Sequence, residues 1–352
     1  HIPMPATPSA SPDAGIATLY RDHHSWLHGW LRLKLGDAHR AADLAQDTFV
    51  RLLSANSTSP SDTALREPRA YLRTIEPVHN EVQTNQLPFP FSLRLNMKVW
   101  NWMNFTEGEF KPQADKSAEW NRGAYLVQGL GHCGSCHTPK NLIGGDQNAE
   151  FLQGGELQGW MAPNITGAGH VGLGDWSEAD IVQYLKTGAN RYDIASGPMA
   201  EAVEHSTQHW RDDDLMAVAV YLKDLDHEHD KPQPLAATEP VMKAGSAIYA
   251  DRCSGCHTPN GEGIATLFPK LANAPLVNAQ DAASLIRVVL AGNRAGSTDA
   301  APTGPAMPAF AWNLSDENVA DVLTYIRNSW GNAAAPISAD QVREQREALQ
   351  SE

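Results

Sequence analysis

Two short motifs constrain this chain more than any other feature of its sequence. They span 133–137 and 253–257, each reads Cys-x-x-Cys-His, and together they hold all 4 cysteines. The pattern is that of covalent c-type haem attachment. Thiols three positions apart lie on one helical turn, so each can form a thioether with a haem vinyl group while the next residue, a histidine, is held under the iron. We therefore predict two haem c groups per chain, bound covalently by Cys133, Cys136, Cys253 and Cys256, with His137 and His257 as axial iron ligands.

Three other uses of paired cysteines fit the sequence less well. A thioredoxin-like redox pair needs a strand before the motif and leaves the histidine without a role. A zinc ribbon places its two Cys-x-x-Cys knuckles about 15 to 20 residues apart, whereas Cys136 and Cys253 are 117 positions apart. Two structural disulfides would not explain why both motifs continue with His-Thr-Pro. Haem attachment is the interpretation that we favour.

The surroundings of the two motifs also repeat, at a spacing of 120 residues. Before each motif a glycine precedes an aromatic residue on a predicted helix: Gly123 precedes Tyr125 in the first copy. Gly245 precedes Tyr249 in the second. A glycine there allows another helix to approach closely, with the aromatic ring stacked against it. The helices expected to cross in this way, each preceded by polar residues that favour a helix start, are 215–222 and 319–326.

This repeat predicts a mainly α protein with two tandem domains of the class I cytochrome c type, preceded by a small helical segment. The length of 352 residues agrees, because it exceeds what one hydrophobic core usually serves. The expected divisions are a disordered N-terminus (1–15), a helical fragment (16–75), a connecting segment (76–115), the first haem domain (116–230), a linker (231–237), the second haem domain (238–332) and a C-terminal tail (333–352).

A second axial ligand is expected for each iron, and methionine is common in electron carriers. After His257 the chain has one methionine, Met307, inside a loop rich in proline and glycine that can lay a thioether over the haem. In the first domain Met199 follows Gly197 and Pro198 in a similar setting, 62 residues after its histidine. We predict Met199 and Met307 as ligands, with Met161 as the main rival for the first site.

Histidine and methionine together fill both axial positions, so such sites carry single electrons and bind no substrate. We accordingly predict no catalytic residue. The imidazole N–H of each histidine also needs an acceptor. Carbonyls near Pro163 and Pro269 are candidates, although either proline could instead shape a loop.

Charge and hydropathy bear on the partners of the chain. It has 27 Lys+Arg and 41 Asp+Glu, a net charge of -14, so nucleic acid is not an expected partner. No window approaches the ~18 to 20 apolar residues of a transmembrane helix. The acidic and histidine-rich stretch 226–230 is predicted to be a solvated hinge. The aromatic stretch 93–105 could touch a membrane, but we favour packing across the haem domains.

Six stretches together carry a family resemblance: 87–91, 120–126, 131–139, 162–166, 197–199 and 205–208. Through them, residues 76–332 resemble the cytochrome c subunit of membrane-bound bacterial dehydrogenases that oxidise alcohols, gluconate or related sugar acids. The resemblance implies that electrons pass from a flavin- or quinone-dependent catalytic subunit through the haems to ubiquinone or a terminal oxidase. It implies a periplasmic location, peripheral to the inner membrane. It also supports Met199 and Met307, which match the ligand positions of the family.

The N-terminal part departs from that family, which carries three haem domains. Residues 1–75 contain no cysteine, and 16–75 instead resemble the start of region 2 of extracytoplasmic-function sigma factors, especially iron-uptake regulators. In such proteins a helix like 43–49 binds core RNA polymerase. The helix that melts promoter DNA and the helix-turn-helix domain do not follow, so RNA polymerase is a conceivable partner only through 16–75. We hypothesise a junction near 71–75, formed by gene fusion or by an error of sequence assembly.

The two parts imply different compartments, because covalent haem attachment belongs to the periplasm and a sigma fragment to the cytoplasm. The sequence begins at His1 without a recognisable signal segment, so we expect a truncated or processed start, or a form that is not exported. A dihaem electron-transfer subunit is the function we favour. The alternative is a polymerase-interacting fusion protein with non-catalytic cytochrome domains. A substrate-oxidising haem enzyme is a weaker third, because it needs an open iron site.

Overall fold

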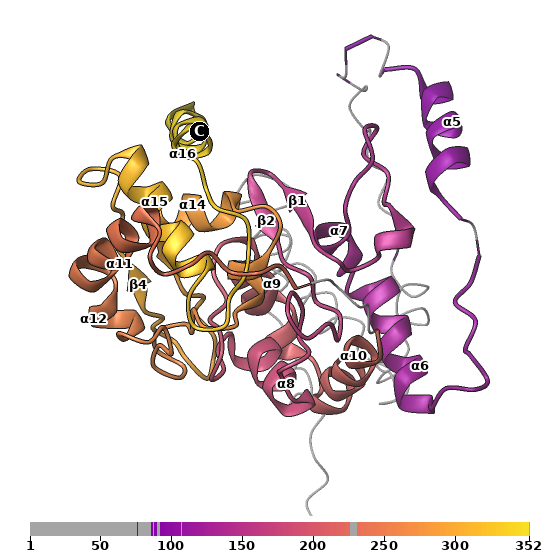
Figure 1. The fold of residues 1–352 in the computed structure, drawn as a ribbon. Coiled ribbons are helices and arrows are strands. Elements are labelled where there is room, and N and C mark those ends of the chain that lie inside the picture. Colours follow the sequence, from indigo (N-terminus) through magenta and orange to yellow (C-terminus); the bar gives the residue numbers. More distant parts are fainter. Residues whose placement is uncertain are drawn as a thin grey trace, which may run out of the picture. The chain divides into compact units, whose positions relative to one another are not determined.

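The structure is a computed structural model, and it describes residues 92–106, 108–225 and 231–351, together with Glu76, Gln86, Pro88 and Phe89 (Figure 1). The predicted N-terminus, the sigma-like fragment 16–75 and the hinge 226–230 lie outside the described residues. Contacts divide the chain into two units, His1–Ser92 and Leu93–Glu352, and every helix and strand described here belongs to the second. That unit is mainly helical, as predicted, with two small two-stranded antiparallel ladders among the described residues.

In the first predicted haem domain, Ser117 caps the opening helix by accepting a hydrogen bond from Trp120 N. The chain then forms a π-helical turn, the short helix of the first motif, a 3-10 turn and a tight hairpin, before four further helical segments. In chain order the elements are α6 (Ala118–Tyr125), η1 (Leu126–Leu130), α7 (Gly134–His137), η2 (Asn148–Glu150), β1 (Gly155–Leu157), β2 (Trp160–Ala162), α8 (Glu178–Thr187), α9 (Pro198–His205), η3 (Thr207–His209) and α10 (Asp212–Asp224).

The second predicted haem domain also runs from an opening helix through the short helix of its motif to a long closing helix, but its ladder follows the middle helices where that of the first domain precedes them. Ser315 and Asn318 form a capping box at the start of its long closing helix. Its two-stranded ladder pairs Asn293 with Met307. The elements are α11 (Pro240–Arg252), α12 (Ser254–His257), α13 (Pro275–Asn278), α14 (Ala283–Ala291), β3 (Asn293–Arg294), β4 (Ala306–Met307), α15 (Asp316–Arg327) and α16 (Ala339–Ser351).

Within each domain, the opening and closing helices pack closely at the predicted glycine. In Figure 1 α6 lies beside α10, and α11 beside α15. A Cβ atom added at Gly123 would lie 1.9 Å from the carbonyl oxygen of Ala217, and one at Gly245 would lie 2.2 Å from that of Asp321. Only glycine allows backbones to approach this closely. The helices 215–222 and 319–326 expected to cross are therefore confirmed as parts of α10 and α15.

The aromatic partner was predicted correctly in one domain and wrongly in the other. Tyr249 is buried and packs 5.7 Å from the ring of Tyr325. In the first domain Tyr125 is exposed, and the ring that packs on Tyr221 belongs to Trp120, 5.0 Å away. Helix periodicity explains the difference: residues three or four positions from the glycine share its face, whereas Tyr125 is two positions away.

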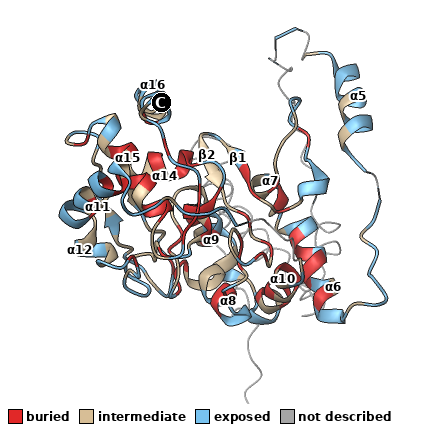
Figure 2. Cartoon of the chain, viewed as in Figure 1, coloured by how far each residue is buried: buried red, intermediate tan, exposed pale blue. Residues whose placement is uncertain are grey.

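Two separate hydrophobic cores result, one in each domain, and Figure 2 shows their buried residues on the facing sides of the helices. The segment 333–351 completes the second core, because α16 packs against α14 and α15 with Val342 fully buried. Arg346 fixes its position by donating to Asp316 at 2.8 Å and to the carbonyl of Leu314 at 3.0 Å. The exact domain boundaries stay a prediction.

The segment 93–105 does not pack across the haem domains, so that expectation was wrong. It forms α5 (Arg94–Asn104), in which no residue is buried and Trp102 is 83% exposed (Figure 2). Polar groups attach it to the loop 141–145: Trp100 Nε1 donates to Ile143 O at 2.8 Å, and Asn141 Nδ2 donates to Asn104 Oδ1 at 2.8 Å. No helix in the described part of the chain is both long and apolar enough to span a bilayer.

Candidate haem sites

The first motif forms a helical turn, as its spacing predicts. His137 N donates to Cys133 O at 3.0 Å, and Thr138 N donates to Gly134 O at 3.1 Å. This turn places Cys133 and Cys136 on the same short helix, with both thiols unpaired. Burial raises the pKa of Cys133 to about 11, so the thiol is neutral near pH 7. A neutral thioether suits the same apolar surroundings.

The imidazole of His137 is half-buried and oriented by a single carbonyl. Its Nδ1 lies 2.7 Å from Pro163 O, which confirms the acceptor expected near that proline. Because a carbonyl only accepts, Nδ1 carries the proton and Nε2 is left with its lone pair. Burial lowers the pKa of His137, with the Pro163 hydrogen bond opposing it in part. The site therefore holds a neutral imidazole, the form that binds a metal.

The second motif repeats this geometry. His257 N donates to Cys253 O at 3.0 Å, and His257 Nδ1 lies 2.9 Å from Pro269 O. Burial lowers the pKa of His257 and raises the pKa of Cys253 to about 11. The two candidate sites thus share a thiol pair on one turn, a neutral imidazole and a proline carbonyl that orients it.

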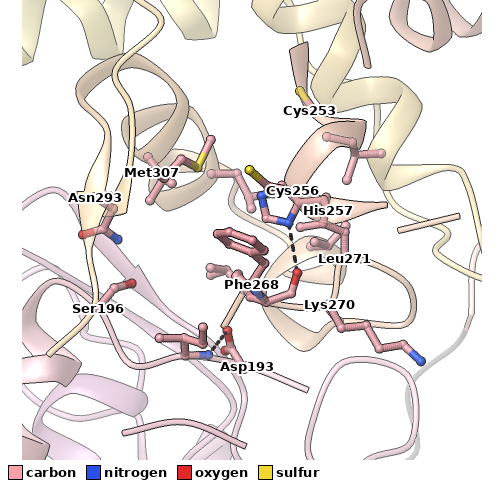
Figure 3. Close-up of a pocket in the computed structure, with 18 of the residues that line it drawn as sticks. Asp193, Ser196, Cys253, Cys256, His257, Phe268, Lys270, Leu271, Asn293 and Met307 are labelled. Atoms are coloured by element: carbon pink, nitrogen blue, oxygen red, sulfur yellow. Dashed lines mark hydrogen bonds between the residues drawn. The ribbon is translucent and has the colours of Figure 1, made fainter. Parts of the chain in front are cut away.

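A cavity of about 220 Å³ opens beside the second motif. Cys253, Cys256 and His257 line one side of it, and Met307 on β4 enters it from another element, as Figure 3 shows. The remaining wall is largely apolar. Paired thiols, a metal-binding nitrogen and a thioether around an apolar cavity are the groups that a covalently attached haem requires. The residues present therefore fit haem c.

The first domain also supplies part of this wall, which the sequence did not predict. Tyr192, Asp193 and Ser196 line the cavity of the second motif, and Figure 3 labels Asp193 and Ser196 among its lining residues. Burial raises the pKa of Asp193 to about 6, with the hydrogen bond from Ile194 N opposing it. No sequence signal points to these residues, because their distance from the second motif along the chain is long and only the folded arrangement of the two domains brings them together.

The predicted methionine ligands occupy different kinds of element. Met307 lies in the ladder between β3 and β4, in the same cavity as His257. Met199 is the second residue of α9, which begins at Pro198 directly after Gly197. The φ of Gly197 is 55°, in the left-handed region. Met161 lies in β2. The assignment of Met199 and not Met161 to the first site stays a prediction.

Comparison with known proteins agrees with this geometry. The Cytochrome c family model matches residues 121–226 and 242–330, which together make up more than half of the chain. The chain belongs to the cytochrome c family. The Sigma-70 region 2 model matches residues 19–76. Both resemblances drawn from the sequence are thereby confirmed, and so is the tandem arrangement of two cytochrome c domains.

Individual relatives match most of the chain, nearly all of it, or a short segment alone. The chain is 37% identical over 303 residues to the gluconate 2-dehydrogenase cytochrome c subunit of Pantoea cypripedii, covering 80% of this chain and 69% of the relative. It is 32% identical over 372 residues to the fructose dehydrogenase cytochrome subunit of Gluconobacter japonicus, covering 97% of this chain and 73% of the relative. A shorter match, 45% identical over 58 residues, links it to the ferric citrate uptake sigma factor of Escherichia coli, covering 16% of this chain and 31% of the relative.

Proposed function

We propose that this cytochrome is the electron-transfer subunit of an oxidoreductase complex and carries two haem c groups. The observation that carries the proposal is the duplicated site. Each Cys-x-x-Cys-His turn directs a half-buried imidazole at a proline carbonyl, 2.7 Å away in the first domain and 2.9 Å away in the second. A chance motif gives no reason for this second contact, whereas a haem-binding histidine needs it to fix its ring.

Each residue then has a defined task. The cysteines would anchor the porphyrin by thioether bonds, and the histidine Nε2 and methionine sulfur atoms would hold the iron. When bound, haem c supplies reversible one-electron transfer. Pro163 O and Pro269 O hold the imidazole tautomers, and the apolar walls exclude water. The proposed residues are Cys133, Cys136, His137 and Met199 in the first site, and Cys253, Cys256, His257 and Met307 in the second.

The electron donor and acceptor are inferred from relatives. Subunits of gluconate and fructose dehydrogenases are similar to this chain over most of its length, so a flavin- or quinone-dependent catalytic subunit is the proposed donor. Ubiquinone or a terminal oxidase is the proposed acceptor. Thioether attachment of haem sets the proposed location at the periplasmic face, peripheral to the inner membrane.

A second candidate function rests on one observation, the Sigma-70 region 2 match over residues 19–76. Through this segment the chain would hold core RNA polymerase. A tagged fragment 16–75 is expected to capture core polymerase from purified components if this function is real. Failure of capture, with a complete sigma factor as the positive control, would leave electron transfer as the one proposed function.

Visible spectroscopy tests electron transfer. The full chain is exported behind a signal segment in a host that attaches haem c, purified, and reduced with dithionite. We expect sharp reduced bands, haem that survives denaturing electrophoresis, and about half the haem in a variant with Cys253→Ser and Cys256→Ser. A colourless, correctly exported chain would contradict the proposal.

A further inference from the structure

We propose that Ser284, which belongs to the second haem domain, is a positioning residue for the first haem site. This inference rests on the proposed function, because it assumes that His137 binds haem. Ser284 is the second residue of α14 and is 3% exposed. Its hydroxyl accepts a hydrogen bond from Met161 N at 2.7 Å and donates one to Met161 O at 3.0 Å. One buried side chain thus satisfies both backbone groups of a residue in the other domain.

The place of Met161 in its hairpin explains why this contact is needed. β1 and β2 pair Leu157 with Trp160, Glu156 with Met161, and Gly155 with Ala162. In an antiparallel ladder the paired residues alternate between those that exchange hydrogen bonds and those whose backbone groups point outward. Both backbone groups of Met161 bond to Ser284 and not to Glu156, so Met161 is a residue whose backbone groups point outward from the ladder. Ser284 therefore takes the place of a neighbouring strand at the free edge of β2.

The held strand leads directly to the histidine. Two residues after Met161, the carbonyl of Pro163 accepts from His137 Nδ1 at 2.7 Å. The intervening residue, Ala162, belongs to the same strand, so little backbone freedom remains between the serine contact and the carbonyl. Fixing Met161 fixes where Pro163 O lies, and that position sets the direction and strength of the bond to the imidazole.

The same helix reaches the other proposed ligand of the first site. The guanidinium of Arg287, one turn after Ser284, lies 4.8 Å from the ring centroid of Trp160. That ring covers Gly197 so closely that a Cβ atom there would lie 2.9 Å from it. Gly197 is two residues before Met199. α14 therefore contacts the strand that leads to the acceptor of His137, and it also contacts the tryptophan ring that packs on the residue two positions before Met199.

At the second site the roles of the domains are exchanged, because the first domain supplies the supporting contact. Lys270 N donates to Tyr192 O of the first domain at 2.9 Å. Lys270 follows Pro269, whose carbonyl orients His257. Each domain thus braces the segment that carries the histidine acceptor of the other, although a serine hydroxyl does so in one case and a backbone carbonyl in the other. A contact that served interdomain packing alone would have no reason to fall beside both acceptors.

Removal of the hydroxyl has a predictable electronic effect. In Ser284→Ala, β2 loses its edge partner and the Pro163 hydrogen bond to His137 weakens. A weaker acceptor makes the imidazole less basic, which stabilises ferric iron less. The reduction potential of the first haem should therefore rise, while that of the second haem stays unchanged.

The test is a potentiometric titration of the holoprotein, followed by its visible bands, for the parent chain and three variants. Ser284→Ala is expected to raise one of two midpoint potentials, seen as a several-fold change in the oxidised-to-reduced ratio of one haem. Ser284→Thr, which keeps the hydroxyl, should restore the parent value. Thr298→Ala is the matched control: Thr298 is also buried, and its hydroxyl donates across the domains to Thr187 O at 2.9 Å, far in sequence from either acceptor.

Two results would overturn the proposal. The first is that Ser284→Ala leaves both potentials at the parent values with full haem content. The second is that Thr298→Ala shifts them as much as Ser284→Ala does, because the effect would then be one of domain packing. Should Ser284→Ala fail to accumulate, Ser284→Cys, a weaker donor of similar size, takes its place under the same criteria. A parent chain without haem would be recognised before any variant is compared, and would refute the proposed function together with this inference.

Discussion

The two cytochrome c domains of this chain build the same turn from nearly the same residues, yet the acceptor carbonyl and the candidate methionine come from different kinds of element in each. In the first domain the histidine acceptor, Pro163, directly follows a strand, β2. In the second the corresponding acceptor, Pro269, lies in a loop. The candidate methionines differ likewise, since Met199 starts a helix and Met307 ends a two-residue strand. A repeated motif therefore determines the local turn, whereas the groups that complete the site can come from whatever element the longer loops provide.

The largest expected effect tests whether the two methionines are equivalent. Because a thioether ligand favours reduced iron, Met307→Ala and Met199→Ala should each lower one midpoint potential, by on the order of a thousandfold in the reduced-to-oxidised ratio at fixed ambient potential. Each should also open that iron to cyanide or carbon monoxide. Titration with ligand-binding spectra is the measurement. Met161→Ala is the control, and if it alone gives the effect, the proposed ligand of the first site is wrong.

The next prediction concerns the helix crossings, where the two domains are most alike. Alanine at Gly123 or at Gly245 would push its Cβ into the backbone of the crossing helix, at 1.9 Å or 2.2 Å from a carbonyl oxygen. Each change should cost about 3 kcal/mol in the free energy of unfolding. Gly129→Ala is the matched control, because nothing lies within 4 Å of its added Cβ. Urea unfolding checks both, and a small effect at one glycine would break the equivalence of the domains.

A smaller effect is expected where the first domain borders the cavity of the second. Burial raises the pKa of Asp193 from 3.8 to about 6. The folded state therefore binds this proton more tightly than the unfolded state, so ionised Asp193 reduces stability increasingly as the pH rises from 3.8 to about 6. Asp193→Asn should be more stable than the parent by about 2–3 kcal/mol above that range and equal to it below. Unfolding at several pH values is the measurement, and a variant that keeps the pH dependence of the parent would refute it.

The smallest effects on stability are expected in the two flanking helices, α16 and α5, and the two helices should differ. Val342 on α16 is fully buried, so Val342→Ala should cost about 2 kcal/mol. Trp102 on α5 is 83% exposed, so Trp102→Ala should change stability by less than about 0.5 kcal/mol. Thermal unfolding of both variants is sufficient. A large loss in Trp102→Ala would mean that α5 contributes to folding in a way that its contacts do not show.

Features with a local cause could be predicted from the sequence. The turn of each motif follows from residue spacing, and the crossing helices follow from a glycine on a helix face. The acceptor carbonyls near Pro163 and Pro269 were named as candidates, because a buried imidazole needs a partner. In each of these cases the physical requirement and the residue that meets it lie in one short segment or in an obvious repeat.

The remaining features depend on contacts between segments far apart in the sequence. The choice of Tyr125 in place of Trp120 failed because the face of the helix, and not proximity in sequence, decides which ring meets α10. The roles of Asp193 and Ser284 could not be foreseen, since an isolated aspartate or serine carries no signal until the other domain lies against it. α5 was misjudged because its apolar composition suggested burial, whereas polar groups dock it on a loop.

The most direct test of the account is the intact mass of the denatured polypeptide after export in a host that attaches haem c. Thioether-bound haem remains on the chain under denaturing conditions, so the account predicts a mass equal to the 38.2 kDa polypeptide plus two haem groups, falling to one in the Cys253→Ser, Cys256→Ser variant. The bare polypeptide mass, obtained from a chain shown to have reached the periplasm, would contradict the claim that both motifs anchor haem.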